Sequence, residues 1–262
     1  MLYRLIRIAV GILAAASSAA AQERPFAFSV AIAQETRPSA RFDYDVGIGE
    51  RTFQSDTSNQ PEARIGIHAS YGRLTFLGRV GMSEVGSSYQ SSHSGEAFLT
   101  LLAPRRTVTL AVGGGVLHEA SGVNVMLARV IAGRQTHAWQ LQGNLLLQKP
   151  LAAVARDGVD LITSVGWAHR ITPSVSLGVE AIGEDLEGFW DAAEAEGGAR
   201  FLTGPSLHIA PPGERWQLIA TGGPMFHPSD SQLSSGALRD LPPDARRSGY
   251  AVKASLSVSF AR

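Results

Sequence analysis

Residues 139–148 of the chain read Trp-Gln-Leu-Gln-Gly-Asn-Leu-Leu-Leu-Gln, and apolar and polar side chains alternate along most of this stretch. Positions 139, 141, 143, 145 and 147 carry Trp, Leu, Gly, Leu and Leu, whereas positions 140, 142, 144 and 148 carry Gln, Gln, Asn and Gln. Successive side chains of a β-strand point to opposite faces. The stretch therefore predicts a strand with one apolar face and one amide-rich polar face.

The same two-residue period recurs along the chain. In residues 250–260 the even positions are all apolar, from Tyr250 to Phe260, whereas Lys253 and three serines share the opposite face. Clear alternation also marks residues 41–48, 64–71, 159–167 and 175–180, and weaker alternation marks 74–84, 96–103, 107–117, 123–132, 199–209 and 216–226. No stretch of similar length shows a helical period. The sequence thus predicts an all-β protein of about twelve strands.

The connections between these strands alternate in length. Short turns are expected at 72–73, 104–106, 133–135, 170–173 and 211–214, and longer polar loops at 50–62, 85–95, 149–158, 183–198 and 227–248, with 118–122 as a short exception. Short turns at one end and long loops at the other are typical of an up-and-down antiparallel barrel that crosses a bilayer. Such a sheet must close, because every backbone amide in hydrocarbon needs a partner.

Composition excludes several other classes. The 262 residues are 44% hydrophobic and 18% charged, and they include no Cys. Disulfide scaffolds, thiolate zinc sites and cysteine nucleophiles are therefore excluded. The 23 basic and 23 acidic residues cancel, so the chain has no basic footprint for nucleic acid. The seven His are scattered without metal-ligand spacing, and we expect no metal, no cofactor and no catalytic residue.

The first residues are typical of a secretory signal peptide. Residues 1–21 contain two Arg, a short apolar run from Ile8 to Ala16 and a final run of three Ala. The apolar run is too short for a membrane-spanning helix. We expect residues 22–40 to form an N-terminal segment on the periplasmic side, or the start of a strand broken near Pro38, and residues 41–262 to form the barrel.

Four large aromatic residues fall at the same level of the predicted meander. All of them lie near the short-turn ends of strands and on apolar faces: Tyr71, Trp139, Trp167 and Trp216. Aromatic rings with a polar group gather where hydrocarbon meets lipid headgroups. We interpret the four as an aromatic girdle. The alternative is that they fill a wide part of a soluble core.

These features together resemble the bacterial outer-membrane β-barrel class, in a porin-like form, without matching a named family. The resemblance rests on the signal peptide, the meander and the amphipathic last strand that ends near Phe260. It implies an outer-membrane location, lipid contact, and recognition of the C-terminal strand by the barrel-insertion machinery. Ala261 and Arg262 follow the aromatic residue, which departs slightly from that signal.

If the apolar faces meet lipid, the polar faces line a lumen. The charged or titratable candidates on those faces are Asp43, Asp45, Arg64, His68, Arg79, Asp160, Glu180, Arg200 and Lys253. Barrel closure places the last strand beside the first, so we expect Lys253 near Asp43 or Asp45. Charges of both signs can hold water and set selectivity in an open channel. They can equally pair and plug a barrel of this size.

Two weaker signals concern ions and catalysis. The loop 184–198 carries six acidic and no basic residues, so cation binding is an open possibility. His68 lies near Ser70 in the sequence, and His118 lies near Ser121. Because a serine hydrolase needs a Ser beside a His, a lipid hydrolase is a third hypothesis. However, His68 and Ser70 are predicted to face the lumen rather than the lipid.

The sequence therefore predicts a non-enzymatic outer-membrane barrel, either a channel for passive diffusion or transport of small solutes or a structural envelope protein. The runner-up is a soluble periplasmic barrel or sandwich that binds a small apolar ligand. The surroundings of the apolar strand faces distinguish the membrane barrel from the soluble protein. In the soluble protein they are buried, whereas in the membrane protein they form an exposed band.

Overall fold

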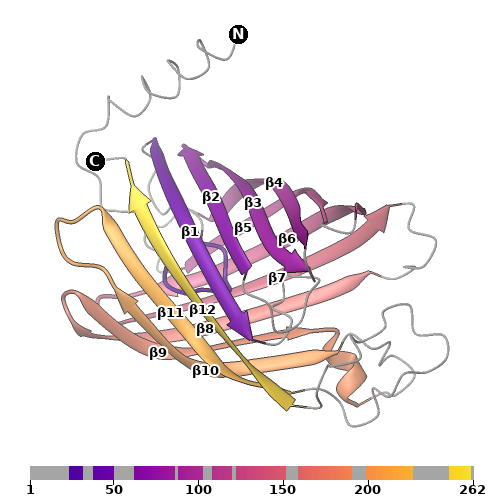
Figure 1. The fold of residues 1–262 in the computed structure, drawn as a ribbon. Helices are drawn as coiled ribbons and strands as arrows, with labels where there is room; N and C mark the ends of the chain where they lie inside the picture. Colours follow the sequence, from indigo (N-terminus) through magenta and orange to yellow (C-terminus); the bar gives the residue numbers. More distant parts are fainter. Residues whose placement is uncertain are drawn as a thin grey trace.

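The chain forms twelve antiparallel strands in a computed structural model that describes residues 24–31, 38–49, 62–85, 88–102, 108–119, 122–151, 159–190, 199–226 and 248–260 (Figure 1). The strands are β1 (Ser39–Gly49), β2 (Glu62–Tyr71), β3 (Leu74–Val85), β4 (Ser88–Leu102), β5 (Val108–His118), β6 (Asn124–Gln135), β7 (Trp139–Leu151), β8 (Asp160–Thr172), β9 (Val175–Glu184), β10 (Arg200–Ile209), β11 (Trp216–Phe226) and β12 (Ser248–Ser259). The predicted signal peptide lies outside the described residues.

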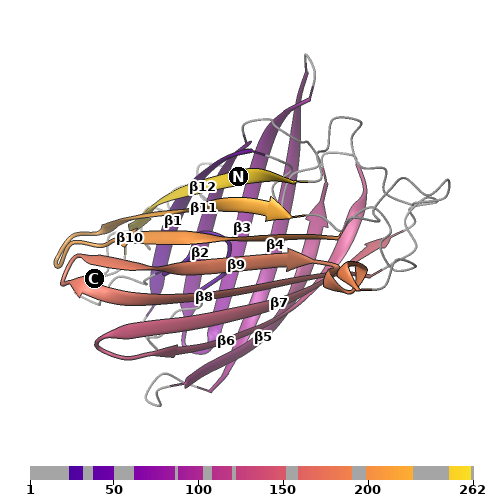
Figure 2. The same ribbon diagram turned by 90° about the horizontal axis from the view of Figure 1, so that it is seen from below.

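The sheet closes on itself. Every strand pairs with its neighbours in the chain, and β1 pairs with β12, where Tyr44 lies opposite Leu256. The prediction of a closed all-β barrel of about twelve strands is confirmed. We call the rim that holds the start of β1 and the turn between β2 and β3 the short-turn end, and the opposite rim the long-loop end. Figure 2 views the barrel from another side.

One predicted connection is wrong. Residues 85–95 were expected to form a polar loop, but β3 extends to Val85 and β4 begins at Ser88, with Met82 opposite Ser91. The stretch is rich in Ser, Gln and His on both faces, so it lacks the alternation that the prediction required. Strand pairing needs only the backbone, and alternation is required only where one face meets lipid. A short 3₁₀ helix, η1 (Leu186–Phe189), follows β9.

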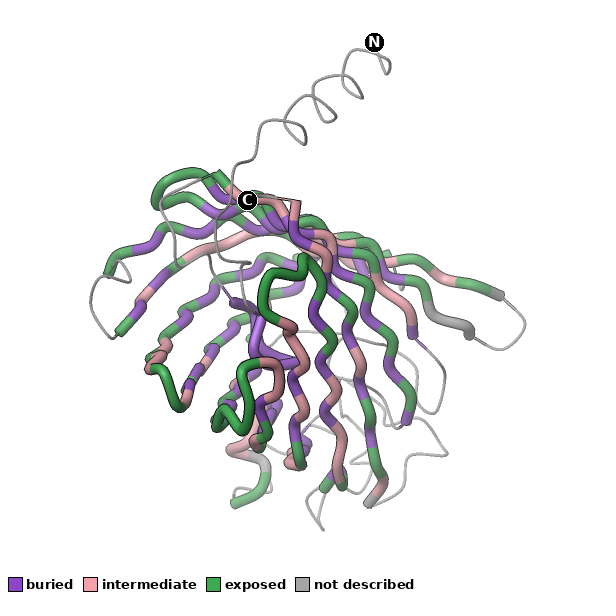
Figure 3. The backbone as a smooth tube through the Cα atoms, turned by 90° about the vertical axis from the view of Figure 1, so that its left-hand side faces the viewer, coloured by how far each residue is buried: buried purple, intermediate pink, exposed green. Residues whose placement is uncertain are grey.

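The apolar face of each strand points outward. Leu141, Leu145 and Leu147 are each about 40% exposed, whereas Gln140, Gln142 and Lys253 on the opposite faces are buried. Buried and exposed residues alternate in the same way along most of β1, β2, β6 and β7 (Figure 3). The outer surface is therefore a continuous apolar band, which a soluble protein cannot leave exposed to water. The chain is a transmembrane β-barrel, and the soluble alternative is not favoured.

The inner face is only partly polar. Apolar side chains from neighbouring strands pack together inside the barrel, among them Leu77, Phe98 and Ile131 in one cluster and Leu146, Ile162 and Leu202 in another. The lumen is thus partly filled by a hydrophobic core. Within the described residues, no helix is long and apolar enough to cross a membrane.

Candidate functional site

The predicted lumen residues all lie on inward-facing positions of their strands. Asp43, Asp45, His68, Glu180, Arg200 and Lys253 are buried, whereas Arg64, Arg79 and Asp160 are partly buried. Lys253 Nζ lies 3.8 Å from Asp45 Oδ2, as expected from barrel closure. Further buried charged residues were not among the predicted set, for example Arg24, Arg41, Glu62, Glu96 and Arg129.

The interior charges form pairs within β1, between β1 and β2, and between β4 and β6. Arg41 Nη2 donates to Asp43 Oδ2 at 3.0 Å, and His68 Nε2 lies 3.1 Å from the same oxygen. On the other side of the barrel, Arg129 binds Glu96 through two hydrogen bonds of 2.8 and 3.2 Å. Two-point contacts between guanidinium and carboxylate are the stronger kind of charged hydrogen bond. Each pair offsets the cost of holding charge away from bulk water.

Residues 24–31 lie inside the barrel, which the sequence analysis did not predict. All eight are buried, and Phe26 and Ala27 have no exposed surface. Pro25 and Ala31 lie near the short-turn end beside Gln140, whereas Phe28 reaches farther in, beside Gly47 and Glu62. The segment therefore enters from the short-turn end, turns near Phe28 and returns, and Figure 3 shows it within the ring of strands.

Backbone groups of this segment bind polar side chains of the wall. The N–H groups of Ala27, Phe28 and Ser29 donate to the carboxylate of Glu180 at 3.0, 2.9 and 3.1 Å. The N–H of Val30 donates to Asn144 Oδ1 at 2.9 Å. Gln142 Nε2 in turn donates to the carbonyl oxygen of Val30. One buried carboxylate on β9 thus satisfies three successive amides, which holds the turn in one position.

Arg24 ties the same segment to the closing strands. Its Nη1 donates to Asp45 Oδ1 at 2.7 Å and to Ser255 Oγ at 2.8 Å. Its Nη2 donates to the carbonyl oxygen of Ala27 at 2.6 Å, within the segment. The backbone N–H of Arg24 donates to Gln217 Oε1 at 3.2 Å. Polar groups from β1, β11 and β12 therefore hold this end of the segment.

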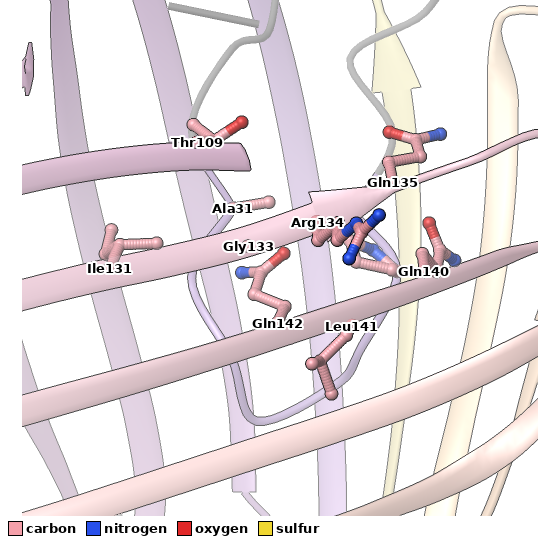
Figure 4. Close-up of a pocket in the computed structure, with 10 residues that line it drawn as sticks. Ala31, Thr109, Ile131, Gly133, Arg134, Gln135, Gln140, Leu141 and Gln142 are labelled. Atoms are coloured by element: carbon pink, nitrogen blue, oxygen red, sulfur yellow. The ribbon is translucent and has the colours of Figure 1, made fainter. Parts of the chain in front are cut away.

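Packing completes the contact between segment and wall. Ala27 and Phe28 belong to the apolar cluster of β6 to β12, and the ring of Phe28 lies 5.4 Å from Lys253 Nζ. Phe26 packs directly over Gly166, where an added Cβ would lie 2.5 Å from the ring. A cavity of about 30 Å³ remains between Ala31 and Gln142 near the short-turn end (Figure 4). It has room for about one water molecule.

The residues considered for lipid hydrolysis are engaged elsewhere. His68 Nε2 accepts a hydrogen bond from Arg41 Nη2 at 2.9 Å, and Ser70 Oγ bonds Thr75 Oγ1 at 3.0 Å. His118 Nδ1 bonds Asn124 Oδ1 at 2.8 Å, and Ser121 lies outside the described residues. His68 and Ser70 are both buried inside the barrel. Of the two pairs, the one that the structure describes in full, His68 with Ser70, is therefore not accessible to a lipid substrate.

The predicted aromatic girdle lies on the outer surface. Tyr71, Trp167 and Trp216 are exposed, and Trp139 is partly exposed. Tyr71 ends β2, and Trp139 and Trp216 begin their strands, all at the short-turn end. Trp167 lies opposite Leu141, farther from that rim. The role of the four as membrane anchors stays a prediction.

The described part of the acidic loop forms a compact corner at the long-loop end. Glu184 is buried and accepts a 2.6 Å hydrogen bond from Arg200 Nε, and Asp185 Oδ1 accepts the N–H of Leu161 at 2.9 Å. Burial raises the pKa of Asp185 to about 7, and the nearby carboxylates of Glu184, Asp160 and Glu187 add to this rise. Residues 191–198 lie outside the described residues, and cation binding there stays a prediction.

We expect the stability of this corner to depend on pH through Asp185. An unfolded Asp ionises near pH 3.9, whereas folded Asp185 ionises near pH 7. The folded state binds more protons in between, so stability falls as pH rises through this window. Asp185→Asn removes the titrating group, so the variant should not lose this stability as the pH rises. Its amide oxygen can still accept the hydrogen bond from the N–H of Leu161. Thermal unfolding in detergent at pH 4.5 and pH 8 should show a smaller difference for the variant than for the wild type.

Glu214→Gln, in the exposed turn before β11, is the control and should leave the difference between the two pH values unchanged. An equal difference in wild type and Asp185→Asn would contradict the assignment.

Comparison with known proteins supports the fold. No family model and no curated protein matches the sequence. Among solved structures, the chain is similar to the KdgM porin in complex with disordered oligogalacturonate, with a TM-score of 0.56, 9% identity, and 83% of this chain and 98% of that chain covered. It is also similar to the NanC porin, with a TM-score of 0.52, 7% identity and the same coverage. At these identities the likeness concerns the barrel architecture.

Proposed function

We propose that the protein is an outer-membrane channel for passive passage of small polar solutes, closed by residues 24–31 in the state described above. The observation that carries the proposal is a closed barrel with an apolar exterior and a lumen lined by charges of both signs. Short turns of such barrels face the periplasm, so the segment enters from that side. The lumen candidates named from the sequence, from Asp43 to Lys253, are the proposed lining.

Two considerations support a polar solute. The wall groups that bind the segment are carboxylates, amides and hydroxyls, for example Glu180, Asn144 and Ser255. A barrel of the same architecture, the KdgM porin, has been seen with oligogalacturonate. The interior charges are mostly paired, so the open channel should show little preference between small cations and anions.

The proposal includes a non-enzymatic role and a route into the membrane. His68 and Ser70 are assigned to structural hydrogen bonds. Lipid deacylation by the purified protein that is lost on His68→Ala would contradict this assignment. The N–H of Phe260 donates to the carbonyl oxygen of Ala40 at 2.9 Å. The residue after β12 therefore lies beside the start of β1. We propose that the insertion machinery recognises β12, and that the four exterior aromatic residues anchor the periplasmic rim.

The test replaces residues 24–31 by Gly and Ser residues at equal length. The replacement keeps the chain length and removes the side-chain contacts of Arg24, Phe26 and Phe28. In planar bilayers we expect few conductance steps from the wild type and sustained steps from the variant. Heat-modifiable migration on a gel checks that both barrels fold. A folded variant that does not conduct would overturn the channel and favour a structural envelope protein.

A further inference from the structure

The guanidinium of Arg24 occupies a site built by the two closing strands. Asp45 on β1 and Ser255 on β12 each accept a short hydrogen bond from Nη1, at 2.7 and 2.8 Å, and Asp43 Oδ2 lies 3.8 Å away. All three wall residues are buried. A carboxylate and a hydroxyl that converge on one N–H group form a specific cation site rather than a general charged surface.

The remaining wall charges do not replace Arg24 well. Asp43 is already bound by Arg41, whereas the other oxygen of Asp45 lies 3.8 Å from Lys253 Nζ, beyond hydrogen-bond distance. Without Arg24, Asp45 Oδ1 and Ser255 Oγ would lose a cationic donor. Glu180 would lose its three amide donors in the same event. A buried carboxylate left without its partner costs several kcal/mol, so the emptied site favours another cationic donor.

The contacts of Arg24 divide between wall and segment. Nη1 faces Asp45 and Ser255, whereas Nε and Nη2 donate to Phe26 and Ala27 of the segment itself. Among the guanidinium nitrogens of Arg24, Nη1 is therefore the one that donates hydrogen bonds to Asp45 and Ser255. A free guanidinium is planar and carries donors on every side, so it can reproduce this contact without the segment.

A small cavity borders the site on the long-loop side of the segment. This cavity, of about 10 Å³, borders Asp45 and is lined also by Phe28, Glu62, Arg64 and Lys253. Its volume is close to the smallest that holds a water molecule. Asp45 thus lies beside Phe28 at the tip of the segment, and this cavity lies on the long-loop side of the tip.

We propose that the Asp45–Ser255 site binds solutes that carry a guanidinium group, which compete with Arg24 and displace residues 24–31. The segment is then the resident occupant of a solute site, and a guanidinium solute is both cargo and opener of the channel. This inference rests on the proposed channel function, but its binding step can be measured without any conductance.

The first experiment is chemical rescue of Arg24→Ala in the full-length protein. We expect the variant to unfold at a lower temperature than the wild type in detergent, and millimolar methylguanidinium to restore part of the loss. Equal methylammonium should restore less, because it lacks the planar donor set. Arg73→Ala, in the exposed turn after β2, should show neither loss nor rescue. Rescue that persists in Arg24→Ala with Asp45→Asn, or no rescue at all, overturns the site.

The second experiment measures binding to the emptied site directly. The barrel with residues 24–31 replaced by Gly and Ser should bind methylguanidinium in a calorimetric titration, and Asp45→Asn in that barrel should abolish the binding. Methylguanidinium added on the long-loop side should also raise wild-type conductance. Binding without conductance in any variant would retain the site and overturn the channel. Conductance of the replaced barrel without binding would retain the channel and overturn the site.

Discussion

Leu145→Arg is expected to destabilise the folded barrel by about 2–4 kcal/mol in lipid, the range for a basic residue at the bilayer midplane. Leu145 lies in the middle of β7 with its side chain on the outer surface, about 40% exposed. Its neighbours in the adjacent strands are Val130 and Thr163. Arg at this depth has no water within reach, and no acidic group faces the lipid beside it. Reversible denaturant unfolding of the barrel in lipid vesicles measures the change.

Leu151→Arg is the matched control. Leu151 lies on the same strand and the same face, at the long-loop end of β7, and is similarly exposed. Arg at that level reaches the headgroups, so the expected cost is only about 0–1 kcal/mol. Equal costs at the two positions would contradict the placement of the apolar band across the bilayer.

Gly166→Ala is expected to raise the ratio of open to closed channel by roughly 5- to 150-fold. The added Cβ would lie 2.5 Å from the ring of Phe26, so Phe26 or the wall must move. Overpacking of this kind costs about 1–3 kcal/mol, and the cost disappears when residues 24–31 leave the lumen. Release of the strain therefore favours the open state by the same free energy. Open probability in planar bilayers is the measurement.

Gly66→Ala tests whether any added methyl group in the lumen has this effect. Gly66 also faces inward, on β2, but its added Cβ would lie 3.5 Å from Asp43 Cβ, an ordinary contact. We expect its open probability to stay at the wild-type value. If both variants open equally, the change does not act through Phe26, and the segment is not the gate.

The barrel itself was predictable because its physical cause lies in each strand. Alternation in 139–148 and 250–260 places one face in lipid and the other inside, and closure follows from the need to pair every amide. Where both faces are polar, as in residues 88–95, that signal is missing, and the sequence predicts a loop where the structure has a strand. In residues 88–95 the strand is held by backbone hydrogen bonds, and the pattern of side chains gives no indication of these bonds.

The filled lumen was less predictable. Leu146 and Ile162 interrupt the alternation of their strands, and both prove to face inward in the apolar cluster. Such interruptions are the available signal for an internal core. The position of residues 24–31 has no comparable signal, because Glu180 binds backbone N–H groups, which every residue type but Pro supplies. The wall groups that bind the segment are also scattered over β1, β7, β9, β11 and β12.

The pairing of β1 with β12 joins Arg41 to Ser259, so the ring is completed by residues from nearly opposite ends of the chain. Contacts of such long sequence separation form late and slowly, because the loop between them must be ordered first. Until that step, both terminal strands present unpaired backbone edges and apolar faces to water. We therefore expect the chain to be aggregation-prone from its synthesis until the two terminal strands pair.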